Sequence, residues 1–229
     1  MTAAPPPPAW TVTSVLEQSY LMARDNFAAF VTITLIFGAI SLVVDVLSLG
    51  LLSGIVHLAC GAATTICITW GSFQVIGGRK PAWEAMLRQV QAPAFGRLLV
   101  LGIVVYFVIG LSAILIVPPL FLLPLWAVAI PAMMVERVDF GAAFSRSADL
   151  TRYRRVPILL IFLLLAAIIA AGATVIFFML GHGALARLVV WVYGAVAATV
   201  MQPLPAILYV LLREEKEGVA PAQIASAAG

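Results

Sequence analysis

Long apolar segments make up most of the chain, and charged residues fall in short stretches between them. Six of these segments approach or exceed the roughly 20 apolar residues that a helix needs to cross a bilayer. They cover residues 27–49, 51–76, 98–117, 120–135, 156–180 and 188–212. A tight turn separates the two segments of each pair, at Gly50, at Pro118-Pro119 and at Gly181-His182-Gly183. The pattern predicts an all-α membrane protein whose six transmembrane helices form three hairpins, at about 27–76, 98–135 and 156–212.

A shorter segment with apolar residues at helical spacing precedes each pair. Residues 11–24 place Val15 and Ala23 on one face and Glu17 off that face. The other two segments have their spaced residues at Trp83, Met86, Leu87 and Val90, and at Phe140, Ala143, Phe144, Ser147 and Thr151. Helices of about 10–14 residues are too short to span a bilayer. We therefore expect three amphipathic helices that lie at the membrane surface.

The same unit of surface helix, span, tight turn and span thus occurs three times. The segment from Ser19 to Arg24 can be aligned with the segment from Ser147 to Arg152, which begins and ends with the same residue types. All three hairpins would then have one orientation. This arrangement differs from the inverted repeats of many transporters, although parallel repeats also occur in transporters.

Composition and charge support the membrane assignment and give it a direction. The chain has 229 residues, of which 63% are hydrophobic and 10% are charged. Soluble domains average about 45–50% apolar and about 25% charged residues, so a water-soluble globular fold is excluded. With the N-terminus in the cytoplasm, all Lys and Arg residues except Arg187 fall on the cytoplasmic side. The positive-inside rule therefore predicts that both termini are cytoplasmic.

The chain ends and the helix interiors carry further signals. Residues 1–10 include four consecutive prolines and are expected to form a disordered lead, and the Ala-rich residues 217–229 are expected to form a disordered tail, which leaves 11–216 as a single membrane domain. Prolines at 124, 131, 203 and 205 predict kinks whose freed carbonyls need hydrogen-bond partners. Gln74 and Gln202 are expected to form hydrogen bonds between spans.

Charged residues around the third surface helix give the first set of candidate functional residues. Glu136, Arg137 and Asp139 lie between a span and this helix and are expected to form an interfacial hinge, with Asp139 as a helix N-cap. Basic residues at the membrane flanks are expected to fix topology and to contact lipid head groups. These anchor residues are Arg79, Lys80, Arg146, Arg152, Arg154 and Arg155.

Asp45 and His57 form the second candidate site, because ionisable residues inside a span are costly and often functional. They lie at comparable depth on either side of the first turn, so a carboxylate–imidazole pair is possible. Three interpretations stay open: a clamp of the hairpin or simple solvation, a proton or ligand site, and a catalytic pair. One His and one Asp form neither a metal site nor a nucleophilic triad.

Three segments resemble a bacterial six-span family, labelled the glycerophosphoryl diester phosphodiesterase membrane domain or YciC-like membrane protein. They are Pro131 to Glu136, Ala142 to Leu150 (AAFSRSADL) and Leu208 to Arg213 (LYVLLR). The resemblance implies a multi-pass protein of the bacterial inner membrane. In fused members the phosphodiesterase activity belongs to a separate soluble barrel domain, so the resemblance implies no enzymatic activity for this chain.

No Walker loop, dinucleotide fingerprint, zinc-ligand spacing or nucleophile elbow occurs in the sequence. We therefore expect a protein that is not an enzyme, has no cofactor or metal, and does not bind nucleic acid. The leading hypothesis is an inner-membrane protein that acts on or through lipids, by organising the bilayer or by assisting transport or insertion. One alternative is an accessory or scaffold subunit with other membrane proteins as partners. The other alternative is an ion-coupled transporter that uses Asp45 and His57.

Overall fold

The computed structural model describes residues 10–47, 50–115 and 117–228, and no strand occurs among them. The α-helices are α1 (Val12–Asp25), α2 (Phe27–Val46), α3 (Leu51–Ile76), α4 (Trp83–Leu87), α5 (Phe95–Ser112), α6 (Val117–Trp126), α7 (Ala129–Glu136), α8 (Phe140–Leu150), α9 (Arg155–Leu180), α10 (Ala184–Met201), α11 (Leu204–Glu217) and α12 (Pro221–Ala227). Two short 3₁₀ helices, η1 (Arg88–Gln91) and η2 (Ala113–Leu115), extend α4 and α5. Six helical stretches are long and apolar enough to cross a membrane. The predicted all-α class and the presence of six helical stretches of membrane-spanning length are therefore confirmed.

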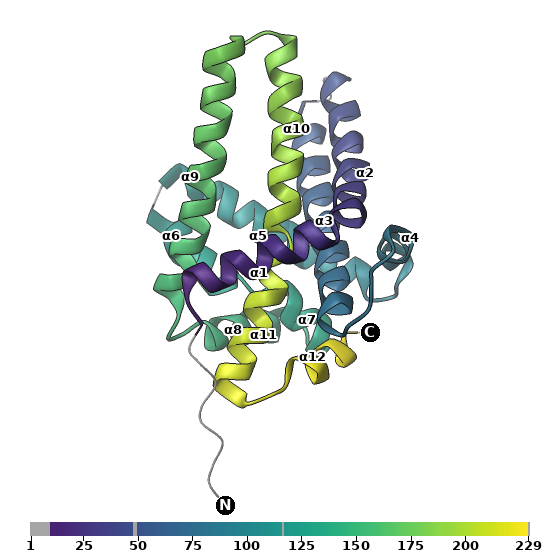
Figure 1. The fold of residues 1–229 in the computed structure, drawn as a ribbon, viewed down its shortest axis with the longest axis vertical. Coiled ribbons are helices and arrows are strands. Elements are labelled where there is room, and N and C mark those ends of the chain that lie inside the picture. The colour runs from purple at the N-terminus through teal and green to yellow at the C-terminus, as the bar shows by residue number, and fades with distance from the viewer. Residues whose placement is uncertain (1–9, 48–49, 116, 229) are drawn as a thin grey trace, which may run out of the picture.

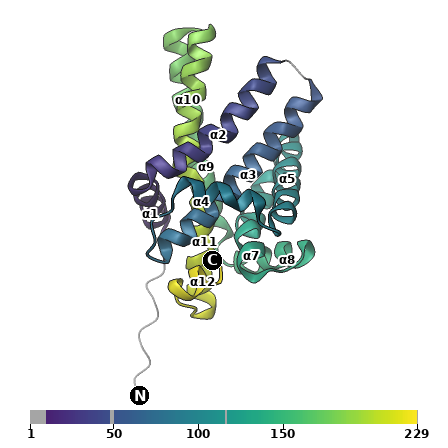
Figure 2. The ribbon, with the colours of Figure 1, turned by 90° about the vertical axis from the view of Figure 1, so that its right-hand side faces the viewer.

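The membrane-length helices pack in chain order into a closed ring. Contacts join α2 to α3, α3 to α5, α5 to α6, α6 to α9 and α9 to α10, and α10 returns to α2. Figures 1 and 2 show α9 and α10 side by side, extending beyond the other helices at the upper end. The surface helices and α11 and α12 lie in the lower half, so the two ends of the ring are built differently.

Two of the spans are broken where prolines interrupt the backbone hydrogen bonds. Pro131 has no N–H to donate to the carbonyl of Ala127, and its ring crowds that carbonyl. The chain accordingly leaves the helical path between α6 and α7, at Ala127 and Val128. Pro203 and Pro205 separate α10 from α11 in the same way. The predicted kinks are thus full breaks in these two spans, whereas Pro124 stays inside α6.

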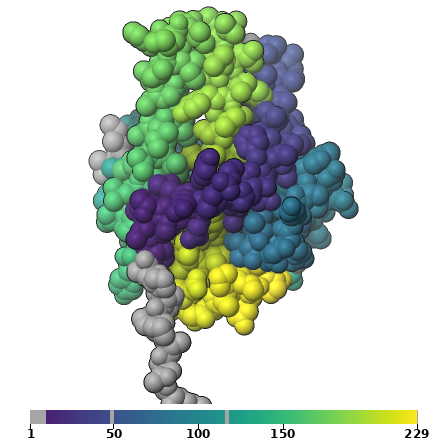
Figure 3. All heavy atoms as spheres, viewed as in Figure 1, coloured from purple at the N-terminus to yellow at the C-terminus, as the bar shows by residue number. Residues whose placement is uncertain are grey.

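The three predicted amphipathic segments form helices that cross the long ones. α1 runs across the ring and packs on α10 and α11, as Figure 3 shows for the purple helix. α4 packs on α2 and α3, and α8 packs on α6 and α7. α1 buries Val15, Ser19 and Ala23, which follow one another at intervals of four residues. Each surface helix therefore covers the second long helix of one of the three units.

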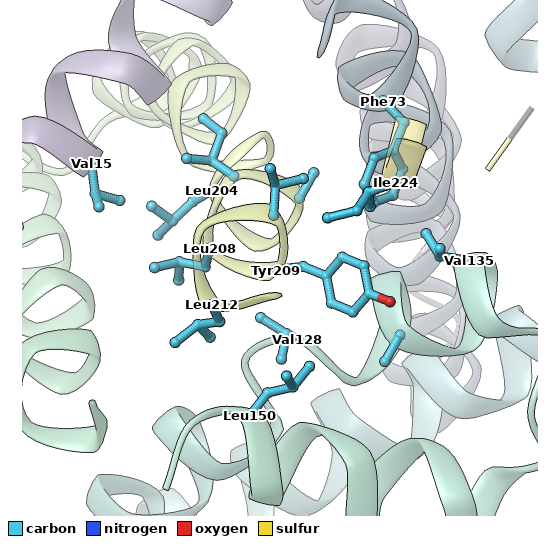
Figure 4. Packing of buried hydrophobic residues seen from close by; sticks show 14 of the residues in the cluster. Val15, Phe73, Val128, Val135, Leu150, Leu204, Leu208, Tyr209, Leu212 and Ile224 are labelled. Atoms are coloured by element: carbon cyan, nitrogen blue, oxygen red, sulfur yellow. The ribbon is translucent and has the colours of Figure 1, made fainter. Parts of the chain in front are cut away.

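The main apolar core surrounds α11 at the lower end of the ring (Figure 4). Leu204, Leu208, Tyr209 and Leu212 of α11 are buried. Side chains from six other helices and the α6–α7 connection pack around them, among them Val15, Phe73, Val128, Val135, Leu150, Ile158 and Ile224. This core couples the surface helices α1 and α8 to the ring, because both contribute side chains that pack around α11.

The C-terminal segment differs from its prediction. Residues 217–229 were expected to be disordered, but Pro221–Ala227 form α12 and bury Ile224 and Ala225. Gly218 ends α11 in the left-handed conformation (φ 68°), and Pro221 starts the next helix, where its missing N–H has no consequence. The prediction of a disordered tail is wrong there because Ile224, together with Val219 and Ala228, packs on the core around α11.

The predicted lead mostly lies outside the described residues, since the description begins at Trp10. Trp10 is buried in the core around α11, at 8% exposure. Its ring lies under the guanidinium of Arg154, with 5.1 Å between the Arg154 Cζ and the ring centroid. Trp10 was included in the predicted disordered lead 1–10, and for this residue the prediction is wrong because its side chain packs in the core.

Candidate functional site

Five polar side chains from α7, α8 and α11 form one connected network, which we call the Glu136 cluster: Glu136, Arg146, Tyr209, Arg213 and Glu217. The Arg146 Nε donates to both carboxylate oxygens of Glu136, at 2.8 and 3.0 Å, and its Nη2 donates to Glu217. The Tyr209 hydroxyl donates to the Glu136 Oε1 at 2.8 Å. Arg213 donates to Glu217 at 2.8 Å and to the Tyr209 hydroxyl at 3.3 Å. The cluster thus ties α11 to the junction of α7 and α8.

Local sequence explains why Glu136 and Arg146 meet. Arg137 ends α7 in the left-handed conformation (φ 53°), which reverses the chain. Asp139 then caps α8, because its Oδ1 accepts the Ala142 N–H at 2.8 Å. The predicted N-cap is confirmed. Two helical turns later Arg146 faces back toward Glu136, so the predicted hinge residues form a tight corner.

The Glu136 cluster is balanced in charge and partly buried. Its two carboxylates face two guanidinium groups, and the charged side chains are only 18–25% exposed. Burial by itself lowers the pKa of Arg146, but its hydrogen bonds to Glu136 and Glu217 outweigh this effect and raise the pKa above its ordinary value. Arg146 therefore stays charged at any physiological pH, and its charge is compensated within the chain.

Two further ion pairs join the end of α11 to α8 and to the start of α9. Lys216 contacts the Asp149 carboxylate at 2.8 Å and also donates to the Asp149 carbonyl. The Lys216 hydrogen bond holds the pKa of Asp149 below its usual range. Arg154 forms a two-pronged pair with Glu215. These contacts supplement the Glu136 cluster at the same end of the molecule.

The six predicted anchor residues therefore fall into two groups. Arg146 and Arg154 have carboxylate partners inside the protein. Within the described part of the chain, Arg79, Lys80, Arg152 and Arg155 form no ion pair. Arg152 stacks on the Tyr153 ring, and Arg155 donates to the carbonyl of Ala148 at 3.3 Å. Contact with lipid head groups thus remains a prediction. The four residues without an ion pair are better suited to it than Arg146 and Arg154, whose charges already have partners within the protein.

Serines from two surface helices bond to the carbonyls at the two helix breaks. The Ser147 hydroxyl on α8 donates to the Leu125 carbonyl at 2.8 Å and accepts the Val128 N–H at 3.3 Å. The Ser19 hydroxyl on α1 donates to the Val200 carbonyl at 2.7 Å. Both serines are buried. The sequence alignment paired these two residues but did not reveal their role, which is to satisfy the carbonyls that the breaks leave free.

The remaining surface helix docks by an apolar contact instead. Met86 of α4 is fully buried against α3, which has no proline and no break. It lies so close to Gly71 that a Cβ on this glycine would be 2.8 Å from the Met86 Cε. Each surface helix therefore makes an equivalent contact with a long helix. A serine makes the contact at the two broken spans, and a methionine makes it at the continuous span.

Asp45 and His57 do form a pair at the tip of the α2–α3 hairpin, with 3.3 Å between the His57 Nε2 and the Asp45 Oδ2. The Ser53 hydroxyl donates to the Asp45 Oδ1 at 2.6 Å, and the His57 Nδ1 lies 2.8 Å from the Ser53 carbonyl. The imidazole does not contact the serine hydroxyl, so the three residues lack the geometry of a nucleophilic triad. Both side chains of the pair are about half exposed, at 46% and 49%.

Exchange of Asp45 for asparagine is expected to change the free energy of unfolding by less than about 1 kcal/mol, because exposed ion pairs contribute little. The measurement is unfolding in mixed micelles with increasing dodecyl sulfate. Asp25→Asn is the matched control, since Asp25 forms an exposed pair with Arg24. A loss several times larger for Asp45→Asn than for Asp25→Asn would contradict this expectation and mark Asp45 as a buried charge in the membrane.

A polar contact between spans involves Thr65, Tyr106 and Gln202. The Thr65 hydroxyl donates to the Gln202 Oε1 at 2.8 Å, and the Tyr106 hydroxyl lies 2.6 Å from the same Thr65 oxygen. The predicted interhelical bond of Gln202 is thus confirmed. Gln74 is buried at 5% exposure, but its Nε2 has no hydrogen-bond partner among the described residues. The bond predicted for Gln74 is therefore not formed by that nitrogen.

Residues 10–47, 50–115 and 117–228 contain no group of three or more metal-ligating side chains. Comparisons of the chain with family models, with curated proteins and with solved structures found no match. The resemblance carried by Pro131–Glu136, Ala142–Leu150 and Leu208–Arg213 therefore stays a prediction.

Proposed function

We propose that this chain is a non-enzymatic protein of the bacterial inner membrane that acts on or through lipids. The observation that carries the proposal is the position of the three surface helices. All three pack on one end of a ring of membrane-length helices. In a bilayer, helices in this position lie among the lipid head groups of one leaflet.

Charge supports an orientation with that end in the cytoplasm. Basic residues follow α3 (Arg79, Lys80), begin α9 (Arg155) and lie near the end of α11 (Arg213, Lys216). Arg187 lies near the start of α10, at the opposite end. This asymmetry is the one that the positive-inside rule describes. The proposal therefore includes three hairpins of like orientation and cytoplasmic termini.

The ion pairs of α11 give the cytoplasmic end a defined architecture. The stretch Ala184–Glu217 has 34 residues. α10 alone has 18 residues and a length of about 27 Å, close to the roughly 30 Å of hydrocarbon, so the end of the stretch that carries α11 projects from the bilayer core. The Glu136 cluster lies at that end. The charged side chains of the cluster are then at head-group depth or in water, where the desolvation cost of an ion-pair network is smaller than in the hydrocarbon.

A scaffold or subunit function is the second candidate, and the α9–α10 hairpin favours it. Of α9, only Ile158 and Ile161 are buried, and both lie near its lower end. Large apolar side chains farther along the hairpin are exposed, including Val175, Phe178, Leu185, Leu188 and Val192. Lipid tails or a partner membrane protein would cover this surface.

Extraction in a mild detergent followed by native mass spectrometry tests both candidates. The lipid proposal predicts that phospholipid copurifies with the chain at a defined ratio. The subunit proposal predicts a second polypeptide at a fixed stoichiometry. A monomer that retains neither lipid nor partner under conditions that keep the protein folded would overturn both.

A further inference from the structure

A pocket of about 430 Å³ opens at the lower end of the ring, between α3, the start of α5, the end of α7 and α12. Apolar side chains form most of its wall, among them Trp70, Phe95, Leu98 and Met133. Its volume lies in the usual range of small-molecule sites, about 300–1,000 Å³. The pocket is separate from the Asp45–His57 pair, and it contains none of the five side chains of the Glu136 cluster.

Two arginines, Arg97 and Arg137, line the pocket, and no acidic residue does. Neither arginine forms a salt bridge with a carboxylate in the described part of the chain, unlike Arg146, Arg154 and Arg213. The pocket therefore combines an apolar wall with two cations whose charge is not compensated locally. An anionic head attached to an apolar body complements such a site.

The backbone at Arg137 gives independent support for a functional role. Arg137 is the one non-glycine residue with positive φ among the residues the structure describes. Glycine adopts this left-handed conformation at a helix end without steric cost, whereas arginine is strained there. A strained residue at a position that glycine would fill better, with its side chain lining a pocket, points to a use for that side chain.

The position of the two arginines along the spans indicates the depth of the pocket. Arg97 lies in the first turn of the stretch Phe95–Leu115, and Arg137 directly follows the stretch Pro118–Glu136. Both arginines are exposed residues and belong to the same end of the ring as the surface helices. In the proposed orientation this end meets the head groups of the cytoplasmic leaflet, and the apolar wall faces toward the hydrocarbon.

We propose that this pocket binds an anionic phospholipid, with the lipid phosphate between Arg97 and Arg137 and the first part of an acyl chain against Trp70, Phe95 and Leu98. Guanidinium groups bind phosphate oxygens through paired, charge-assisted hydrogen bonds. This inference rests on the proposed function in lipids and adds a ligand class and a site to it. The anchors on α8 and α9 are not part of this site.

The test is a lipid titration of the purified full chain, followed by native mass spectrometry. The probes are dioleoyl phosphatidylglycerol, the zwitterionic dioleoyl phosphatidylcholine and free glycerol phosphate. We expect the anionic lipid to bind in preference to the other two. In the variant Arg97→Gln/Arg137→Gly its affinity should fall about tenfold or more, as the loss of charge-assisted hydrogen bonds predicts.

Arg88→Gln is the matched control, because Arg88 lies on η1 beside the pocket-lining Gln89 but does not line the pocket. Its binding should remain within about twofold of the wild type, since one surface charge adds little at moderate salt. Arg137→Gly also relieves backbone strain. The thermal midpoint of this variant should therefore equal or exceed that of the wild type, although its lipid binding is weaker. If the double variant does not fold, Arg97→Gln alone carries the test.

Each of the following five results would overturn the inference. Equal losses in Arg88→Gln and in the pocket variants would indicate a general surface charge effect. Equal binding of phosphatidylcholine would show that the arginines do not select charge, and equally strong binding of glycerol phosphate would show that the site takes a free phosphate. If wild-type protein retains phospholipid but the pocket variants bind it unchanged, the pocket is refuted and the proposed lipid function stands. If no phospholipid binds at all, the proposed function fails as well.

Discussion

Glu136→Gln is expected to lower the free energy of unfolding by about 2–4 kcal/mol. The amide keeps the shape of the side chain but removes the charge that Arg146 and the Tyr209 hydroxyl contact. Two guanidinium groups would then share the single carboxylate of Glu217 in a partly buried place. The loss should appear in dodecyl sulfate unfolding and as a lower thermal midpoint in detergent.

Glu84→Gln makes the same chemical change on α4, where Glu84 is exposed and forms no ion pair among the described residues, and it should have almost no effect. A double-mutant cycle with Arg146→Gln isolates the pair. We expect a coupling energy of about 1–3 kcal/mol, as for residues of one network. A cycle that closes near zero would mean that Glu136 stabilises the corner through its backbone position and not through Arg146.

Much of the fold could be predicted from the sequence because its signals are local. Span length and helical periodicity depend on neighbouring residues only, and they located the six spans and the surface helices. Asp139 was predicted as an N-cap for the same reason, since a cap acts within three residues. Positions of the helix breaks followed from Pro131, Pro203 and Pro205, whose effect on the backbone is also local.

The network of contacts could not be predicted in this way. Arg146 pairs with Glu217 across 71 residues of sequence, and Ser19 bonds to Val200 across 181. No local pattern indicates which carboxylate an arginine will meet when both lie near membrane flanks. The sequence predicts that the basic residues at the membrane flanks are topology and head-group anchors. Two of the six predicted anchors, Arg146 and Arg154, instead form ion pairs within the protein.

The equivalence of Ser19 and Ser147 shows what a weak repeat can and cannot reveal. Their alignment rested on few identities, but the structure places both hydroxyls on a free carbonyl of a broken span. The surface helix of the second unit, α4, has Met86 against Gly71 at the corresponding contact, so side-chain chemistry differs where the span is continuous. The three units therefore share the position of this contact in the fold, but not the type of residue that makes it.

Gly102→Ala is expected to destabilise the ring by about 2 kcal/mol, because an added methyl group overfills a close contact. A Cβ on Gly102 of α5 would lie 2.7 Å from the Cβ of Ala62 on α3. Ala62 is fully buried, and no flexible side chain can move aside there. The backbones of α3 and α5 would have to move apart. Small residues at such contacts normally allow helices in membrane bundles to approach closely. Unfolding in mixed micelles measures the loss.

Gly110→Ala on the same helix is the matched control, because nothing lies within 4 Å of the added Cβ. Alanine favours a helix over glycine, so this variant should be as stable as the wild type or slightly more so. Ala62→Gly removes the opposing methyl group and should restore most of the stability that Gly102→Ala loses, since the pair then holds one methyl group as before. Absence of rescue would mean that Gly102 is needed for its own backbone and not for the approach of α5 to α3.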